Sequence, residues 1–440
     1  MFTPARYIVI DDNADELKQL ADSLQEIGAP FLALHYDEAV GIVEKHLRGV
    51  RLLFLDLHLT RGAEASDNIA PAAGVIISML ENGISPTAGP YIIILWTKHK
   101  RQKEAFESYI MDNLDPAKRP IAVLSLDKNE YMGGRKGDKL TADVGKVIET
   151  DPRLRALLDW ETEVLKAAGS TLSEIGGLVA DKDRTAAGFS KRLDEILSLL
   201  AHEAVGKNNA KNDPYSAVNA ALMPILSDRI ANQRVSPESN AIWKAAATKI
   251  NKVPTLSLED AAKLNSMLHL AKASSEELTP GAWGAVTLLP DAELAEDVMM
   301  RRFALPAGPM SAGTFCLTEE ADQVSAKLCV LRVGASCDYA QSRKGPVPFV
   351  LGAIVRADAP RKDGFLPMAE FATPALMVDG FETPVKMIFN THLQITLVPA
   401  DFDGWEPLCR LRESLLMQIT THGARHATRP AIISFRPPQA

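Results

Sequence analysis

The fold of this chain is decided by the stretch Arg51-Leu52-Leu53-Phe54-Leu55-Asp56-Leu57-His58-Leu59. It is an apolar run long enough for a buried parallel strand, and it leads to a single carboxylate, that of Asp56. In open α/β sheets, the carboxyl ends of the strands border the crevice in which ligands bind. An isolated aspartate after a strand is also a common turn or helix-capping residue, so the meaning of Asp56 depends on the other strands.

Three other apolar runs lead to polar residues in the same way. These polar residues are Asp11 and Asp12 after residues 7–10, Thr97 after residues 91–96, and Lys128 after residues 121–127. The carboxyl ends of parallel strands meet at one edge of their sheet. We therefore expect a cluster of carboxylates at this edge, with a hydroxyl and an ammonium group at its rim.

Between these runs, apolar residues recur at helical spacing, as Leu17, Leu20 and Leu24 do after the first run. The alternation of strand and helix predicts an α/β fold, with a doubly wound, five-stranded parallel sheet in a domain of residues 1–150. The fifth strand is a short run at residues 31–35. We expect further helices over residues 38–43, 75–80 and 102–113 and after Thr141, with an irregular insert at residues 60–73.

The pattern changes after about residue 150. Residues 151–275 keep helical spacing with few strand signals, apart from a polar segment at residues 206–214 that we expect to be a loop. Residues 276–440 carry proline and glycine between short apolar runs, which predicts an α+β domain. We expect strands over residues 326–333, 349–355 and 384–398, a helix over residues 406–422 and a final strand over residues 430–435.

Composition limits the classes of partner and compartment. The 440 residues carry a net charge of −8, with 48 basic and 56 acidic residues and no long block of one sign. We therefore expect no nucleic-acid partner. No apolar run approaches the length of a membrane span, and the first residues lack the pattern of a signal peptide. The four cysteines form no C-x-x-C pair, which favours free thiols in a reducing cytoplasm.

Carboxylates crowded at one sheet edge repel one another, and a hard divalent cation relieves that repulsion. Mg²⁺ is the expected ion because it prefers oxygen ligands and leaves positions that phosphate oxygens can fill. The Thr97 hydroxyl and the Lys128 amine would then neutralise and orient the remaining oxygens of a phosphoryl group. Asp56 stands alone at its strand end, so we expect it to be the nucleophile.

This ordered set resembles the response-regulator receiver domain. The resemblance covers about the first third of the chain and rests on Ile8-Val9-Ile10-Asp11-Asp12, Leu53-Phe54-Leu55-Asp56, Ile94-Leu95-Trp96-Thr97 and Asp127-Lys128. It implies that Asp56 accepts a phosphoryl group from a histidine kinase or a phosphotransfer protein, with a homodimer as a further possible assembly. It also implies the site groups, which are Asp11, Asp12, Asp56 and the backbone carbonyl of His58 for Mg²⁺, and Thr97 and Lys128 for the phosphoryl oxygens.

Three positions depart from the usual receiver pattern. Lys98 follows Thr97 where receivers usually have a small residue, and it would crowd the phosphoryl site or add a charge to it. Ser125 stands where an aromatic residue is common, and Asn129 stands where proline is common. These departures keep an alternative open, in which a degenerate receiver binds a partner as a scaffold without being phosphorylated.

A second candidate site lies in the C-terminal domain. Cys337 and Asp338 follow an apolar strand, and a thiol next to an acid at a strand end could be a nucleophile or a ligand. A buried or turn cysteine is the alternative, because no partner base is identified. We found no DNA-binding module in the sequence, so we expect a non-DNA-binding output domain whose activity the sequence does not reveal.

Overall fold

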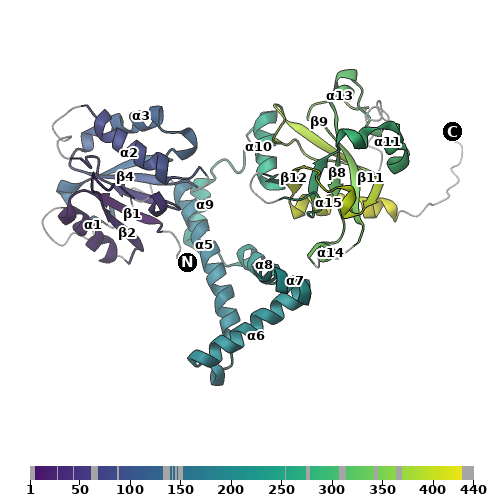
Figure 1. The fold of residues 1–440 in the computed structure, drawn as a ribbon. Coiled ribbons are helices and arrows are strands. Elements are labelled where there is room, and N and C mark those ends of the chain that lie inside the picture. Colours follow the sequence, from purple (N-terminus) through teal and green to yellow (C-terminus); the bar gives the residue numbers. More distant parts are fainter. Residues whose placement is uncertain are drawn as a thin grey trace, which may run out of the picture. The chain divides into compact units, whose positions relative to one another are not determined.

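The computed structural model describes residues 5–26, 28–42, 44–60, 68–86, 89–131, 139–140, 142–143, 146, 152–252, 254–273, 278–306, 314–340, 345–362 and 369–428. The chain divides into two compact units. The first unit holds residues 1–162 and 235–248, and the second holds residues 163–234 and 249–440. Each unit is built around its own sheet (Figure 1).

The first unit is a receiver-like α/β arrangement, which confirms the predicted fold class. Its five strands pair in parallel in the order β2-β1-β3-β4-β5. They are β1 (Tyr7–Asp11), β2 (Phe31–His35), β3 (Leu52–Leu55), β4 (Ile92–Thr97) and β5 (Ala122–Asp127). All four residues of β3 are buried, as the continuous apolar run predicts for a strand covered on both faces.

Helices cover both faces of this sheet. The helix α1 (Ala14–Glu26) packs Leu17, Leu20 and Leu24 against one face, in a cluster that contains Trp96. The helices α2 (Ala70–Gly83) and α3 (Lys103–Asn113) pack against the opposite face. The strand ends that carry the predicted site residues are thereby held on a sheet with two buried faces.

The helix predicted over residues 38–43 is wrong. Gly41 has a φ of 68°, a left-handed conformation that an α-helix cannot contain. The Asp37 carboxylate accepts a hydrogen bond from the backbone N–H of Ala39 at 2.8 Å, which closes a turn in place of a helical N-cap. Among the described residues between β2 and β3, the helical element is a short 3₁₀ turn, η1 (Glu44–His46). The helix predicted after Thr141 falls mostly outside the described residues, as do residues 61–67 of the insert predicted at residues 60–73. The end of that predicted insert is wrong, because residues 70–73 are the first residues of α2.

The middle of the chain is helical, as predicted. Its helices are α5 (Pro152–Gly177), α6 (Ala186–Val205), α7 (Lys207–Asn212), α8 (Pro214–Asn232), α9 (Pro237–Ala246) and α10 (Leu258–His269). The loop predicted over residues 206–214 is wrong, because this segment contains α7. Its Ala210 packs with Ala201, Val205 and Ala217, and this contact stabilises a helix that composition alone does not favour.

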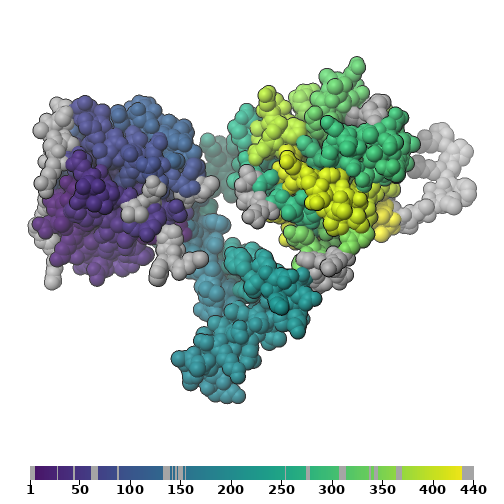
Figure 2. Space-filling view, viewed as in Figure 1, coloured from purple at the N-terminus to yellow at the C-terminus, as the bar shows by residue number. Residues whose placement is uncertain are grey.

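The second unit contains a seven-stranded antiparallel sheet in the order β10-β11-β9-β8-β7-β12-β6. Its strands are β6 (Leu270–Lys272), β7 (Ala285–Leu288), β8 (Lys327–Arg332), β9 (Val347–Arg356), β10 (Glu370–Ala372), β11 (Val385–Leu397) and β12 (Pro407–Leu411). The described helices around it are α11 (Glu296–Phe303), α13 (Glu320–Ser325), α14 (Ser336–Ala340) and α15 (Glu413–Ala427). The helix α15 buries Leu415, Leu416 and Ile419, and its outer face is visible in Figure 2.

The helix predicted over residues 406–422 begins too early. Residues 407–411 form β12, which pairs with both β6 and β7 and buries Cys409 and Leu411. Pairing with two strands overrides the helical spacing of this segment. Because both strands come from distant parts of the chain, the local sequence does not reveal the pairing. The final strand predicted over residues 430–435 lies outside the described residues. Among the helices that the structure describes, none is both long and apolar enough to cross a membrane.

Candidate functional site

The candidate site lies where the carboxyl ends of four adjacent strands meet. Asp11 is the last residue of β1, Asp56 follows β3, Thr97 is the last residue of β4 and Lys128 follows β5. The backbone N–H of Asp56 donates to the carbonyl of Ile10 at 3.0 Å, which extends the ladder between β1 and β3 to the site itself. Parallel pairing therefore brings together residues that are far apart in the sequence.

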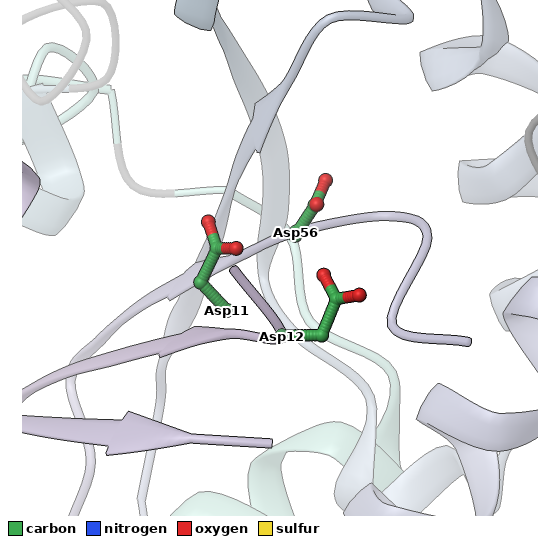
Figure 3. A group of neighbouring side chains, drawn as sticks. All are labelled: Asp11, Asp12 and Asp56. Carbon is green, nitrogen blue, oxygen red and sulfur yellow. The ribbon is translucent and has the colours of Figure 1, made fainter. Parts of the chain in front are cut away.

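Three carboxylates form the acidic part of the site. One oxygen from each of Asp11, Asp12 and Asp56 lies within 4.8 Å of the others, and Figure 3 shows the three groups rising on the same side of the strand ends. Asp11 is fully buried, whereas Asp12 and Asp56 are half-buried. A set of oxygen ligands that is partly open to solvent fits a hard divalent cation that keeps some of its waters.

Lys128 places an ammonium group directly on these acids. Its Nζ lies 2.8 Å from Oδ2 of Asp56 and 2.8 Å from Oδ2 of Asp11, and only 1% of the side chain is exposed. Burial by itself disfavours the ammonium form, but the charges of Asp56 and Asp11 outweigh burial and raise the pKa of Lys128. Lys128 is therefore a permanent cation at neutral pH.

Burial acts on the acids in the opposite direction. It raises the pKa of Asp11 from 3.8 to about 6, although Lys128 opposes the shift. Burial also raises the pKa of Asp56, again against the effect of Lys128. Both shifts mean that burial disfavours the ionised carboxylates, and a cation bound to them would favour that ionised form.

Two further predicted site residues are Thr97, which ends β4 next to β3, and His58, which comes two residues after Asp56. Thr97 is fully buried, and its Oγ1 accepts a hydrogen bond from the backbone N–H of His99 at 3.1 Å. The His58 imidazole contacts the Gln102 side chain, with Nε2 2.8 Å from Oε1, and is itself buried. The metal-binding role of the His58 carbonyl and the phosphoryl-binding role of Thr97 stay predictions.

Sequence reasoning missed Glu16, which is the second acid of the first turn of α1. Its Oε2 lies 2.6 Å from Nζ of Lys128 and its Oε1 lies 2.5 Å from Nζ of Lys98. These two ammonium groups lower the pKa of Glu16 even though burial alone would raise it. An acid in the first turn of a helix ordinarily serves the helix dipole, so its position in the sequence gave no sign of a place in the site.

Lys98 also differs from what the sequence suggested. Its ammonium group is tied to Glu16, and 42% of its side chain remains exposed. The pair therefore adds one negative and one positive charge to the rim of the site and leaves its net charge unchanged.

The second candidate site is only partly described. Cys337 belongs to α14, but its side chain lies outside the described part of the structure. Asp338 and Tyr339 line a surface hollow together with Arg332. The other three cysteines are buried, and burial raises the pKa of the Cys409 thiol to about 12, so this thiol is protonated and unreactive at neutral pH.

Comparison of the chain with protein-family models, with curated proteins and with solved structures found no match. The fold and the site therefore define the first unit only as a receiver-like α/β domain with an acidic cluster that could bind a metal ion.

Proposed function

We propose that the first unit is a response-regulator receiver that accepts a phosphoryl group on Asp56 from a histidine kinase or a phosphotransfer protein. The observation that carries the proposal is the 2.8 Å contact between the buried Lys128 ammonium and Asp56, beside the carboxylates of Asp11 and Asp12. This arrangement supplies a nucleophile, a cation for the phosphoryl oxygens and ligands for a divalent cation at one sheet edge.

The reaction follows from the chemistry of these groups. An Asp56 oxygen attacks the phosphorus of a phosphohistidine, the P–N bond breaks, and the leaving imidazole takes up a proton as the acyl phosphate forms. Lys128 offsets the charge that collects on the phosphoryl oxygens, and the Thr97 hydroxyl lies at the end of the neighbouring strand β4. Asp11, Asp12 and Asp56 would hold Mg²⁺, which supplies electrostatic stabilisation of the transferred group when it is bound.

In this proposal, phosphorylation of the first unit controls the second unit as a non-DNA-binding output domain. A cytoplasmic setting belongs to the same proposal, since phosphotransfer from a histidine kinase occurs in that compartment for proteins that the chain resembles.

The second candidate function is a scaffold that binds a partner without phosphorylation. The contact between Glu16 and Lys128 favours it, because Glu16 competes with a phosphoryl group for the same ammonium. The two functions differ in one measurable property, which is whether Asp56 becomes phosphorylated.

The test is to incubate the full chain with Mg²⁺ and acetyl phosphate and to measure its intact mass. We expect a gain of one phosphoryl group that needs Mg²⁺ and is absent from Asp56→Asn. Asp127→Asn is the matched control, because Asp127 ends the neighbouring strand β5 and its carboxylate caps a turn by accepting from the backbone N–H and the side-chain amide of Asn129. A folded wild-type protein that gains no mass, or an Asp56→Asn variant that still gains it, would contradict phosphoryl acceptance at Asp56.

A further inference from the structure

A hollow of about 690 Å³ lies at the end of strand β8 in the second unit. Its lining includes the charged side chains of Arg332, Asp338 and Asp403 and the aromatic rings of Tyr339 and Phe402.

Arg332 is the unusual member of this lining. Arg332 is the last residue of β8 and is only 7% exposed. It directly follows Leu331, which belongs to the core. Its Nη1 donates to the carbonyl of Val333, and its guanidinium lies 6.0 Å from the centre of the Tyr339 ring. Its Nε is buried without a hydrogen-bond partner, and no carboxylate of the described residues pairs with it within 4.0 Å.

A buried guanidinium without an ionic partner is costly. Arginine keeps its charge in proteins, so it does not escape the cost by losing a proton. Burial lowers the pKa of Arg332, and the partial opposition by Tyr339 and Asp338 does not cancel that effect. Buried charges are normally paired, and Asp338 acts on Arg332 only from beyond ion-pair distance, so an anion in the hollow would complete the pairing.

The backbone beside Arg332 leaves room for its guanidinium group. Gly334 has a φ of 120°, and a Cβ at this position would lie 2.7 Å from Nη1 of Arg332. The carbonyl of Gly334 is fixed by the indole N–H of Trp283 at 2.9 Å. A side chain at position 334 would therefore displace the guanidinium, whereas glycine allows it to lie at the hollow.

We propose that this hollow binds a small organic acid whose carboxylate pairs with Arg332. The guanidinium fork matches the two oxygens of a carboxylate. Tyr339 and Phe402 offer apolar surface to the body of the molecule. A single buried positive charge suits a monoanion, and the acidic groups of Asp338 and Asp403 in the same lining disfavour a dianion such as a phosphate ester.

The test uses benzoate as the probe and benzamide as its neutral counterpart of similar shape, each titrated into the full chain by calorimetry. We expect saturable binding of benzoate with a dissociation constant of ~1 mM or tighter, and at least ~30-fold weaker binding to Arg332→Met. Arg356→Met is the matched control, because Arg356 also belongs to this sheet but pairs with Asp322 at 3.1 Å. It should bind benzoate as the wild type does.

Thermal unfolding separates ligand binding from a purely structural role. If Arg332 awaits a ligand, Arg332→Met unfolds at the wild-type temperature or above it, because a buried unpaired charge has been removed. Benzoate should raise the unfolding temperature of the wild type and of Arg356→Met, but not that of Arg332→Met. The proposal is overturned if benzoate and benzamide bind equally, if Arg332→Met binds benzoate as tightly as the wild type, or if ~10 mM benzoate gives no response in the wild type.

Discussion

Replacing Lys128 by methionine should destabilise the metal-free protein strongly at neutral pH. The Lys128 ammonium has carboxylate partners in Asp11, Glu16 and Asp56, with N–O distances of 2.8, 2.6 and 2.8 Å. Removing one partner of a buried ion pair costs about 3–5 kcal/mol, because the remaining charge is left buried and unpaired. We expect a loss of this size in the unfolding free energy of the first unit, since the variant leaves these acids without their common cation.

The assay is a urea titration in the presence of a chelator. Unfolding is monitored by hydrogen exchange and mass spectrometry of peptides from β1 and β3. Reading these peptides isolates the first unit, which matters because a chain with two units need not unfold in one step. Lys139→Met is the matched control, because its ion pair with Glu130 is about half exposed and should change the free energy by at most ~1 kcal/mol.

Mg²⁺ should reverse part of this loss if the acids bind it. At ~100 times its dissociation constant, a ligand of the folded state adds about 2.7 kcal/mol to the stability of the fold. The reasoning is refuted if Lys128→Met unfolds at the same urea concentration as the wild type in the chelator. It is also refuted if Mg²⁺ stabilises neither protein.

Three further outcomes are expected. Mg²⁺ affinity, measured by titration calorimetry, should fall ~5-fold from pH 6 to pH 5, because Asp11 has a pKa raised to about 6 and must lose its proton to bind the metal. The metal's stabilising effect is thus full above about pH 6 and declines progressively below it. Glu16→Gln should lower the unfolding free energy by ~1–3 kcal/mol, whereas Lys98→Met, whose side chain is 42% exposed, should lower it by at most ~1 kcal/mol in the same urea assay. Gly352→Ala should lower the thermal midpoint of the second unit by an amount equivalent to ~1–3 kcal/mol, because the new Cβ would lie 2.5 Å from Phe389; an unchanged midpoint would show that this ring has room to move.

The sheet of the first unit could be predicted because its strands are indicated by patterns in the local sequence. The strands β1, β3 and β4 are apolar runs that lead to a polar residue, and burial on both faces requires such a run whatever the partner strands are. The missing helix at residues 38–43 shows the limit of this reasoning. The spacing of its apolar residues is helical, but the left-handed backbone at Gly41 ends the pattern, and a glycine alone does not announce its φ.

Errors in the second unit have a different cause. Residues 407–411 form a strand because β6 and β7 lie on either side of it, and both come from more than 100 residues earlier in the chain. Glu16 was missed for a related reason. Its role depends on where α1 places its first turn relative to Lys128, which follows β5, and no spacing within residues 11–16 records that distance. Arg332 likewise reads as an ordinary charged residue at a strand end until its burial is known.

The charges of the candidate site bear on the choice between its two proposed functions. Its acids are Asp11, Asp12, Glu16 and Asp56, and its bases are Lys98 and Lys128. Four negative charges therefore face two positive charges. The excess of two negative charges equals the charge of one divalent cation in magnitude. A phosphoryl group would raise the charge on Asp56 from one to ~2 negative units, and an adjacent cation must offset the increase. Lys128 already contacts Asp56. Lys98 can supply its positive charge to a phosphoryl group only if its ion pair with Glu16 breaks. Glu16 and Lys98 form an ion pair without net charge, so the pair leaves unchanged the charge balance that phosphoryl acceptance requires. The presence of Lys98 therefore does not favour the scaffold over the receiver.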